Sequence, residues 1–494
     1  MNGSNSMKIL LISPTNSDLL HAVSVPVGLV SIGTYLKQAG HEVRIVDLSV
    51  SHQSIKKVVN EFNPDLCGVS VRSAKSVAFA VDVSKKVHRM GVPVVWGGPF
   101  CDQAPLEHFF DSGVIDVLSF SEGEMTWLEL ADAFENGKPF DDIKGIAFRK
   151  DGRIIRTEDR DFMDLSKILP CDWSMVDVPK YFQYLYGAEK LLYLYLSKGC
   201  PGHCSFCYNI EFHRSCHRRK PLEVFMHEIK ELVAYGLDGF YLADEMAFMK
   251  KSDLYDLCDA LDSEGYKMTW GFQTRIGALN KEDIQRAYDS GCRWIDFGIE
   301  SGSPRMIKKI GKNIPLDKIH PTFKWCEEVG IITMSNFILG LPGETCEDLK
   351  HSVDLAKSLP NNEPTFLLYG YNYGSPVGKE IYNSGKYKLP KKLKDYSKID
   401  FCYNKLPSFS ETPAWDKKVV QGYFLWNQLF RKDYSKSTKS FDMIYKHLKI
   451  VFDRISYVGI LHLPEALIKS AFPFIRFFVS AKFCKKTRKK YGLD

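Results

Sequence analysis

Short apolar runs alternate with amphipathic, helix-like stretches along most of the chain. Between residues 7 and 150, β-like runs end in small or turn-forming residues, and helical patterns fall between them. This rhythm is typical of an α/β domain with a doubly wound, Rossmann-like parallel sheet. Ligands of such sheets bind beyond the carboxyl ends of the strands. The expected strands are residues 8–13, 42–47, 66–71, 93–97 and 117–120.

The same β-then-α rhythm returns after residue 190 with a different set of turns. Six strands, each followed by a helix, predict a partial (β/α)6 barrel of the TIM type, with its chemistry at the C-terminal ends of the strands. The expected strands are residues 191–196, 239–243, 269–273, 294–298, 333–339 and 365–371.

Two further segments complete the predicted domain organisation. Residues 141–190 predict a connector that begins with a hairpin turning at Asp151-Gly152. After residue 384 the strand rhythm stops, and the remaining chain predicts a helical region with a basic tail. The expected units are therefore a first domain at 1–140, the connector at 141–190, the barrel at 191–384 and a helical C-terminal region at 385–494.

Charge and composition narrow the functional classes. The net charge of +6 is carried by one tail, because the rest of the chain balances. Nucleic-acid binding would require a basic stripe across a folded face, so we expect no nucleic-acid partner. Scattered thiols and the lack of an N-terminal signal pattern predict a cytoplasmic protein. The cations of the tail are Lys482, Lys485, Lys486, Arg488, Lys489 and Lys490.

The apolar residues before this tail leave two interpretations open. Phe472, Phe474, Phe477 and Phe478 followed by the cations fit a peripheral contact with an anionic membrane. Packing on the barrel explains the same pattern. No apolar stretch is long enough to span a bilayer.

The strongest chemical signal is a set of three cysteines, Cys200, Cys204 and Cys207, in a loop after the run at 191–196. Soft thiolates select zinc, copper(I) or an iron–sulfur cluster. Structural zinc usually takes four protein ligands, whereas three cysteines leave one iron of a 4Fe–4S cluster free for a substrate or cofactor. The alternatives are a zinc loop completed by Cys216 or His203, and thiols that only pack.

The loop resembles the radical S-adenosylmethionine (SAM) enzymes, whose motif is Cys-x3-Cys-x-aromatic-Cys, with Phe206 at the aromatic position. The resemblance covers residues 7 to about 382. It implies that the three cysteines hold a 4Fe–4S cluster, whose free iron chelates SAM and cleaves it reductively to a 5′-deoxyadenosyl radical. We also expect an electron donor such as flavodoxin or ferredoxin.

The resemblance also implies a set of SAM contacts at successive strand ends. Glu245, chosen over Asp244, is expected at the SAM ammonium, because a charge-assisted hydrogen bond is the stronger kind. Arg275 is expected to pair with the SAM carboxylate through its planar fork, and Glu300 to accept from ribose hydroxyls. Each residue taken alone also fits an ordinary cap, ion pair or turn. The remaining predicted SAM-binding residues are Phe206, Tyr208, Ser301, Gly340 and Leu341.

The first domain resembles the cobalamin-binding domain that precedes the radical SAM domain in one branch of the family, often called class B. The matching pieces are Pro26-Val27-Gly28-Leu29, Ala39-Gly40-His41-Glu42-Val43, Gly97-Gly98-Pro99 and Glu122-Gly123-Glu124. The predicted cobalamin contacts are Ser13, Pro14, Thr15, Gly28, Ser70, Gly97, Gly98, Pro99, Glu122 and Gly123.

One departure from classical cobalamin proteins affects the expected ligand set. Where those proteins carry Asp-x-His-x-x-Gly, this chain has Pro14-Thr15-Asn16-Ser17-Asp18. The lower face of cobalt is then expected to lack an imidazole ligand. The alternative is a flavodoxin-like sheet that docks or regulates without binding cobalamin.

These resemblances imply methylation of an unactivated carbon, in which the substrate radical takes a methyl group from methylcobalamin. The alternative enzyme is a radical cyclase, ring-rearranging or carbon–carbon bond-forming enzyme, similar to the anaerobic magnesium-protoporphyrin ester cyclase group. A non-catalytic cobalamin or iron–sulfur sensor is the hypothesis from another class. The substrate is expected to be a small or lipid-like molecule, and Tyr373 is a candidate contact for it.

A group of cations after the cysteines has two interpretations. Arg214, Arg218, Arg219 and Lys220 either stabilise an anionic cluster or steer an acidic substrate, or they form a solvated cationic face.

Overall fold

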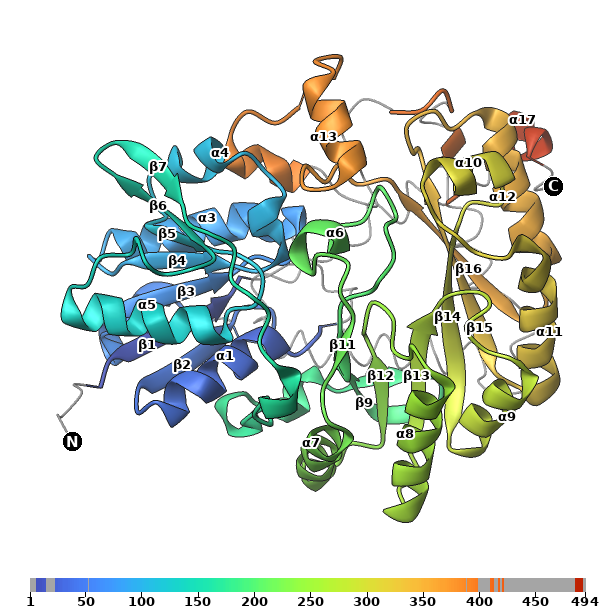
Figure 1. The fold of residues 1–494 in the computed structure, drawn as a ribbon, viewed down its shortest axis with the longest axis horizontal. Coiled ribbons are helices and arrows are strands. Elements are labelled where there is room, and N and C mark those ends of the chain that lie inside the picture. Colours follow the sequence, from blue (N-terminus) through green and yellow to red (C-terminus); the bar gives the residue numbers. More distant parts are fainter. Residues whose placement is uncertain are drawn as a thin grey trace.

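Two seven-stranded sheets form the framework of the computed structural model (Figure 1). The structure describes residues 6–14, 23–51, 53–387, 389–398, 409–412, 416–417, 420–421 and 485–491. One sheet is built from strands between residues 8 and 156, and the other from strands between residues 183 and 368. The α/β class expected from the sequence is confirmed.

The N-terminal sheet has the strand order β2-β1-β3-β4-β5-β6-β7. Its first five strands are parallel, and all five expected strands are confirmed. The hairpin that the sequence analysis assigned to the connector joins this sheet, because Ser119 of β5 pairs antiparallel with Ile146 of β6. The strands are β1 (Lys8–Ser13), β2 (Glu42–Asp47), β3 (Leu66–Ser70), β4 (Val94–Gly97), β5 (Val117–Ser119), β6 (Ile146–Lys150) and β7 (Arg153–Arg156).

Both faces of this sheet are covered, as the continuous apolar strands require. In β1, Leu10 and Ile12 pack into one core and Ile9 and Leu11 into the other, because successive side chains point to opposite faces. Helices α1 and α5 contact each other, and so do α2 and α3. The helices are α1 (Val27–Gln38), α2 (Ile55–Phe62), α3 (Val77–His88), α4 (Leu106–Phe110) and α5 (Glu124–Asn136).

The second sheet has the order β16-β15-β14-β13-β12-β9-β8, with β9 to β16 parallel. Its end strands β16 and β8 do not pair with each other, so the barrel is partial, as expected. Strand β16 begins three residues before the expected start and includes Pro364, which an edge strand tolerates. The strands are β8 (Gln183–Leu185), β9 (Ala188–Leu194), β12 (Gly239–Leu242), β13 (Thr269–Thr274), β14 (Cys292–Glu300), β15 (Ile332–Leu339) and β16 (Asn362–Leu368).

Helices on the outer side follow the strands of this sheet (Figure 1). In β15, fully buried residues alternate with partly buried ones, as expected when one face is covered by helices and the other lines an open barrel. The helices are α7 (Leu222–Ala234), α8 (Lys251–Ser263), α9 (Lys281–Asp289), α10 (Pro304–Lys309), α11 (Ile319–Val329), α12 (Cys346–Ser358) and α13 (Pro376–Asn383).

The connector fills the space between the two sheets. Trp173 and Tyr181 are each 2% exposed, and the Tyr181 hydroxyl donates to Asp47 Oδ2 at 3.2 Å. These two aromatic side chains therefore pack in the interior. After the barrel, residues 393–398 return to the first domain, where the ring nitrogen Nδ1 of His108 lies 3.1 Å from the Tyr396 hydroxyl.

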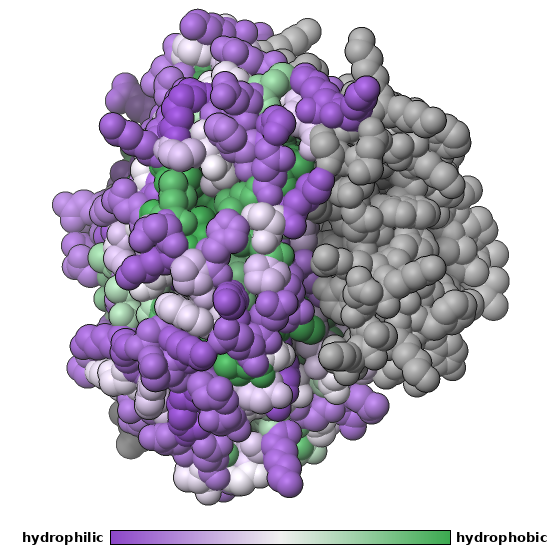
Figure 2. Space-filling view, turned by 90° about the vertical axis from the view of Figure 1, so that its right-hand side faces the viewer, coloured by the Kyte–Doolittle hydropathy of each residue, from purple (hydrophilic) through white to green (hydrophobic). Residues whose placement is uncertain are grey.

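Most of the expected C-terminal helical region lies outside the described residues, including the phenylalanines predicted to touch a membrane or the barrel. Helix α17 (Lys485–Lys490) carries part of the basic tail, and Lys490 forms an ion pair with Asp416 at 2.8 Å. None of the helices in the described ranges is long and apolar enough to cross a bilayer. Hydrophilic side chains dominate the described surface in Figure 2, with apolar areas between them.

Candidate functional site

The three-cysteine loop begins and ends at a short antiparallel pair, β10 (Ser197–Lys198) and β11 (Arg218–Arg219). Gly199 follows β10 with φ of +81°, and any Cβ there would collide with the carbonyl oxygen of Cys216. Asn209, which is 1% exposed, accepts from the Cys200 N–H at 3.1 Å and donates to the Cys200 carbonyl at 2.6 Å. These contacts fix the start of the loop, and sequence analysis missed Asn209.

The cysteines Cys200, Cys204 and Cys207 are all partly exposed and free of disulfides. Burial raises the pKa of Cys204, whereas the nearby cations Lys312 and Arg275 lower it. Burial raises the pKa of Cys207 to about 12. Among the described residues, no three His, Cys, Asp or Glu side chains lie close enough together to hold a metal ion. Whether the cysteines suit a cluster is therefore judged from the chemistry of their thiols. Three soft thiols on one anchored loop, with two cations beside them, suit an anionic iron–sulfur cluster.

The two carboxylates after β12 have different environments. Asp244 is fully buried and accepts hydrogen bonds from the Leu196 and Ser197 backbone and from the Ser197 hydroxyl. Burial raises its pKa to about 7. It holds the end of β9 in place and does not line the cavity described below.

Glu245 faces the cysteine loop instead. Its carboxylate accepts the Gly199 N–H at 3.0 Å and the Tyr208 hydroxyl, and it lies 3.5 Å from His213 Nε2. Burial alone would raise the pKa of Glu245, but the contacts with His213 and Tyr208 outweigh it and hold the pKa at about 2. Glu245 is therefore an anion at the edge of the loop.

The other expected SAM contacts lie at the ends of β13, β14 and β15. Arg275 packs against Gly202 of the loop and donates to the Asn313 carbonyl at 3.2 Å. Glu300 has a φ of +68° and pairs with Lys312 at 2.6 Å, a partner that the sequence did not reveal.

Three smaller positions complete this edge. Ser301 lies 3.3 Å from the Ser352 hydroxyl, the Gly340 N–H donates to Glu344, and Leu341 is 1% exposed. The structure thus brings the expected residues to one edge of the barrel. Their contacts with SAM stay predictions.

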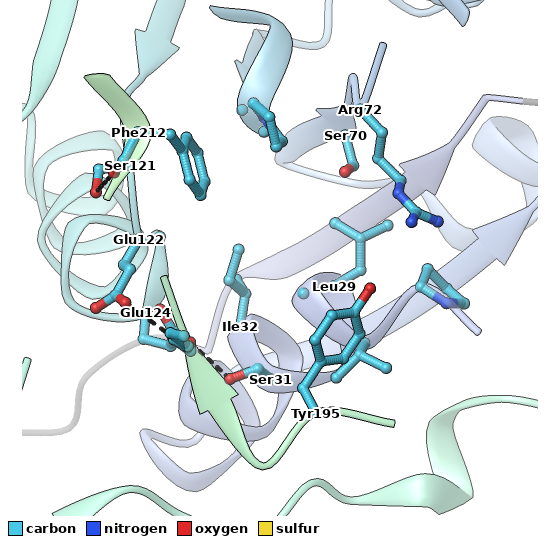
Figure 3. Close-up of a pocket in the computed structure, with 18 of the residues that line it drawn as sticks. Leu29, Ser31, Ile32, Ser70, Arg72, Ser121, Glu122, Glu124, Tyr195 and Phe212 are labelled. Carbon is cyan, nitrogen blue, oxygen red and sulfur yellow. Dashed lines mark hydrogen bonds and ion pairs between the residues drawn. The ribbon is translucent and has the colours of Figure 1, made fainter. Parts of the chain in front are cut away.

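A cavity of about 300 Å³ lies between the carboxyl edges of the two sheets (Figure 3). From the barrel side it is lined by Tyr195, Lys198, Tyr208, Phe212 and Glu245. The predicted cobalamin residues Ser13, Gly28, Ser70, Gly97, Gly98, Pro99, Glu122 and Gly123 line it from the other side.

The cavity departs from the predicted set in a few places. Pro14 does not line it, and Thr15 lies outside the described residues. Figure 3 shows Arg72 beside Ser70, and Tyr195 reaching in from the barrel side. Sequence analysis selected neither Arg72 nor Tyr195, although Arg72 stands directly after an expected strand. Tyr373 also does not line the cavity, and its ring packs edge to face on Tyr382 at 5.0 Å.

Backbone approach shapes the wall of the first domain. Gly98 has a φ of +102°, and a Cβ at this position would lie 2.9 Å from the Val71 carbonyl oxygen. Only glycine is unstrained there, so the backbone itself forms the surface. The size of the cavity falls in the range of ligand pockets, and a wall made of backbone lets a bulky cofactor approach closely.

An ionic network joins the base of the cysteine loop to the first domain. Lys198 Nζ lies 3.0 Å from Glu124 Oε1 and 3.6 Å from Glu122 Oε1, and Arg218, its cross-strand neighbour, also pairs with Glu122. The Ser31 hydroxyl donates to Glu124 at 2.8 Å (Figure 3). Burial alone would raise the pKa of Glu124, but Lys198 lowers it below its ordinary value.

The structure excludes the interpretation of the cations after the cysteines as a solvated cationic face. Arg218 pairs with Glu122, Arg219 with Asp253 at 3.0 Å, and Lys220 with Glu228 at 2.7 Å. Arg214 and Arg218 both stack on the Phe162 ring, at 3.9 and 4.0 Å from its centroid. Ion pairs neutralise Arg218, Arg219 and Lys220, so we do not assign these three cations to an acidic substrate.

We expect Lys198→Met to lower the free energy of unfolding of the apoprotein by about 3 kcal/mol, because it leaves the buried Glu124 carboxylate without its ion-pair partner. Adding Glu124→Gln should recover part of this loss, since the two residues are coupled. Lys138→Met, which breaks an exposed pair with Asp132, is the matched control and should change stability little. Denaturant titration of the unsubstituted protein, both single variants, the double variant and the control measures the coupling, and strictly additive effects of Lys198→Met and Glu124→Gln would contradict it.

Comparisons with known proteins agree with this geometry. The radical SAM superfamily model matches residues 194–356, and the B12 binding domain model matches residues 20–131. A methyltransferase of Pyrococcus horikoshii, itself uncharacterized, is 27% identical over 73% of this chain and 80% of its own length. Cytidylyl-2-hydroxyethylphosphonate methyltransferase of Streptomyces wedmorensis is 25% identical over 76% and 82%. The anaerobic magnesium-protoporphyrin IX monomethyl ester cyclase of Rubrivivax gelatinosus is 25% identical over 70% and 64%.

Two solved structures share the fold. The radical SAM methyltransferase TsrM from Kitasatospora setae, solved with cobalamin and a 4Fe–4S cluster, has a TM-score of 0.67 at 19% identity, covering 91% of this chain and 89% of that one. The cobalamin-dependent radical SAM enzyme OxsB, solved with aqua-cobalamin, has a TM-score of 0.71 at 15% identity, covering 99% and 79%. The chain therefore combines a radical SAM domain at residues 194–356 with a B12 binding domain at residues 20–131 ahead of it.

Proposed function

We propose that this protein is a cobalamin-dependent radical SAM methyltransferase that acts on an unactivated carbon of a small or lipid-like substrate. One observation carries the proposal: the residues next to the cysteine loop and the glycine edge of the first sheet line the same cavity. Two cofactors held at these positions would face each other across the substrate space. A chain that only sensed one cofactor would not need this shared cavity.

The protein's own residues would hold three groups. Cys200, Cys204 and Cys207 would hold the cluster, and Gly97 and Gly98 would let the corrin approach the backbone closely. When bound, the cluster supplies the electron that cleaves SAM, and cobalamin supplies a transferable methyl group. The described residues of the first domain that line the cavity include no histidine, in keeping with a cobalt that must give up its methyl group.

Glu245 and Arg275 would orient SAM. Because its pKa is held at about 2, Glu245 is ionised at neutral pH and can accept from an ammonium group. Arg275 lies against Gly202 of the cysteine loop and keeps free donors on its planar fork.

The cyclase relative supports a second candidate, a radical cyclase or rearranging enzyme with the same cofactors. Two further proposals concern the setting of the protein. Free thiols among the described residues fit a reducing, cytoplasmic compartment, and we keep the basic C-terminal tail as a candidate for peripheral membrane contact. An electron donor such as flavodoxin or ferredoxin would supply the reducing equivalents.

The products distinguish the two candidates. With reduced enzyme, cobalamin and substrate, a methyltransferase should release S-adenosylhomocysteine and 5′-deoxyadenosine in equal amounts, and its product should gain one carbon. Liquid chromatography with mass spectrometry measures all three. Release of 5′-deoxyadenosine alone, with an unchanged substrate carbon count, would exclude methyl transfer and favour the cyclase.

Replacing any one of Cys200, Cys204 or Cys207 by alanine should remove the cluster, because three thiols are the minimum set for this site. The visible absorbance of the anaerobically reconstituted protein and its release of 5′-deoxyadenosine from SAM should both disappear. Cys216→Ala is the control, since Cys216 is exposed and outside the motif. Cluster loss in that control, or zinc bound in the unsubstituted protein, would count against the proposal.

Cobalamin should be lost selectively when side chains fill the first-domain wall. In Gly28→Leu the new side chain occupies part of the cavity without straining the backbone, because a Cβ on Gly28 meets nothing within 4 Å. Gly98→Val fills the opposite side but also strains the backbone. Corrin content by absorbance should fall at least tenfold in both variants while iron content stays unchanged. Normal corrin content in Gly28→Leu would refute this placement of cobalamin.

A further inference from the structure

The cysteine loop has an outer edge that faces away from the cavity. Tyr208, Phe212 and His213 line the cavity on the inner side. Pro201 and His203, between the first two cysteines, are exposed to solvent. A cluster on this loop would therefore lie between the substrate space and the protein surface, and an electron from outside would reach it through this edge.

Helix α10 abuts the same edge. The Ser205 N–H donates to the Ile310 carbonyl at 2.9 Å, and a Cβ on Gly311 would lie 3.3 Å from the His203 carbonyl oxygen. The last helical residues before Ile310 are Lys308 and Lys309, and both are exposed. The C-terminal end of α10 thus adjoins the exposed part of the loop and carries two exposed lysines, of which Lys309 extends over Gly343 of a neighbouring turn.

Among the residues that the structure describes, these two lysines have no ionic partner, unlike most of the cations near the loop. Arg218, Arg219, Lys220 and Lys312 are each paired with a carboxylate. Within the described part of the chain, no ion pair involves Lys308, Lys309 or Arg275. Arg275 packs on Gly202 and is only partly exposed, so the exposed, unpaired cations described on the α10 side of the loop are the two lysines.

We propose that the outer edge of the cysteine loop, together with Lys308 and Lys309 at the end of α10, is the docking surface for an acidic, one-electron donor protein. The proposal rests on the proposed function, because only an enzyme whose cluster is reduced needs a donor. One electron leaves the reduced flavin or iron–sulfur centre of the donor and enters the oxidised cluster, and no atoms are transferred. Unpaired cations on an exposed face raise the encounter rate with an acidic partner and set its orientation.

The first test measures binding, which needs neither SAM nor methyl transfer. Isothermal titration of the cluster-loaded protein with an FMN-loaded flavodoxin, a small acidic protein, should show affinity that weakens with added salt. Lys308→Glu combined with Lys309→Glu should weaken the affinity at least tenfold. The matched control is Lys85→Glu combined with Lys86→Glu, a neighbouring exposed pair near the C-terminal end of α3, and it should change the affinity less than twofold.

The second test measures cluster reduction by stopped-flow absorbance. Reduction by flavodoxin hydroquinone should slow at least tenfold in the α10 double variant, whereas reduction by titanium(III) citrate should keep its rate. Equal losses in the α10 and α3 variants, no loss in either, or a slower reaction with titanium(III) citrate would each overturn the proposal. Because both readouts precede product formation, failed docking is distinguishable from failure of the proposed methyl transfer.

Discussion

The structure depends on the attachment of the cysteine loop to the first domain. Lys198 and Arg218 face each other across the short β-pair at the base of the loop, and both reach carboxylates that follow β5. The Lys198–Glu124 contact joins residues 74 positions apart in the sequence. A buried ion pair with good geometry changes the free energy of folding little when it is intact, but losing one partner is strongly destabilising. The network therefore favours one relative placement of the two domains.

That placement makes two ordinary sheet edges into one site. Parallel strands leave their carboxyl ends on one side of a sheet, where loops carry ligands. Here the two edges face each other across the cavity, with Gly98 on one wall and Glu245 on the other. The connector supports this arrangement, since its side chains Trp173 and Tyr181 are buried. Function therefore follows from how the two sheets are joined as well as from each sheet.

Sequence patterns could predict the parts of the molecule that depend on local order. Strand positions follow from apolar runs, the cysteines from their spacing, and Gly97-Gly98 from a turn after a strand. Contacts between distant segments could not be predicted in this way. Nothing local indicates that Lys312 pairs with Glu300, that Asn209 holds Cys200, or that Tyr195 enters the cavity. The sequence allows two interpretations of Arg218 for the same reason, because its partner Glu122 lies in the other domain.

The central claim is that the cluster and cobalamin face one shared cavity. Electron paramagnetic resonance of protein that holds cob(II)alamin and a one-electron-reduced cluster tests it most directly, since two nearby unpaired spins broaden and split each other's signals. The account predicts such coupling in the doubly loaded protein and its loss when either centre is made diamagnetic. Two unperturbed signals that simply superimpose would contradict it.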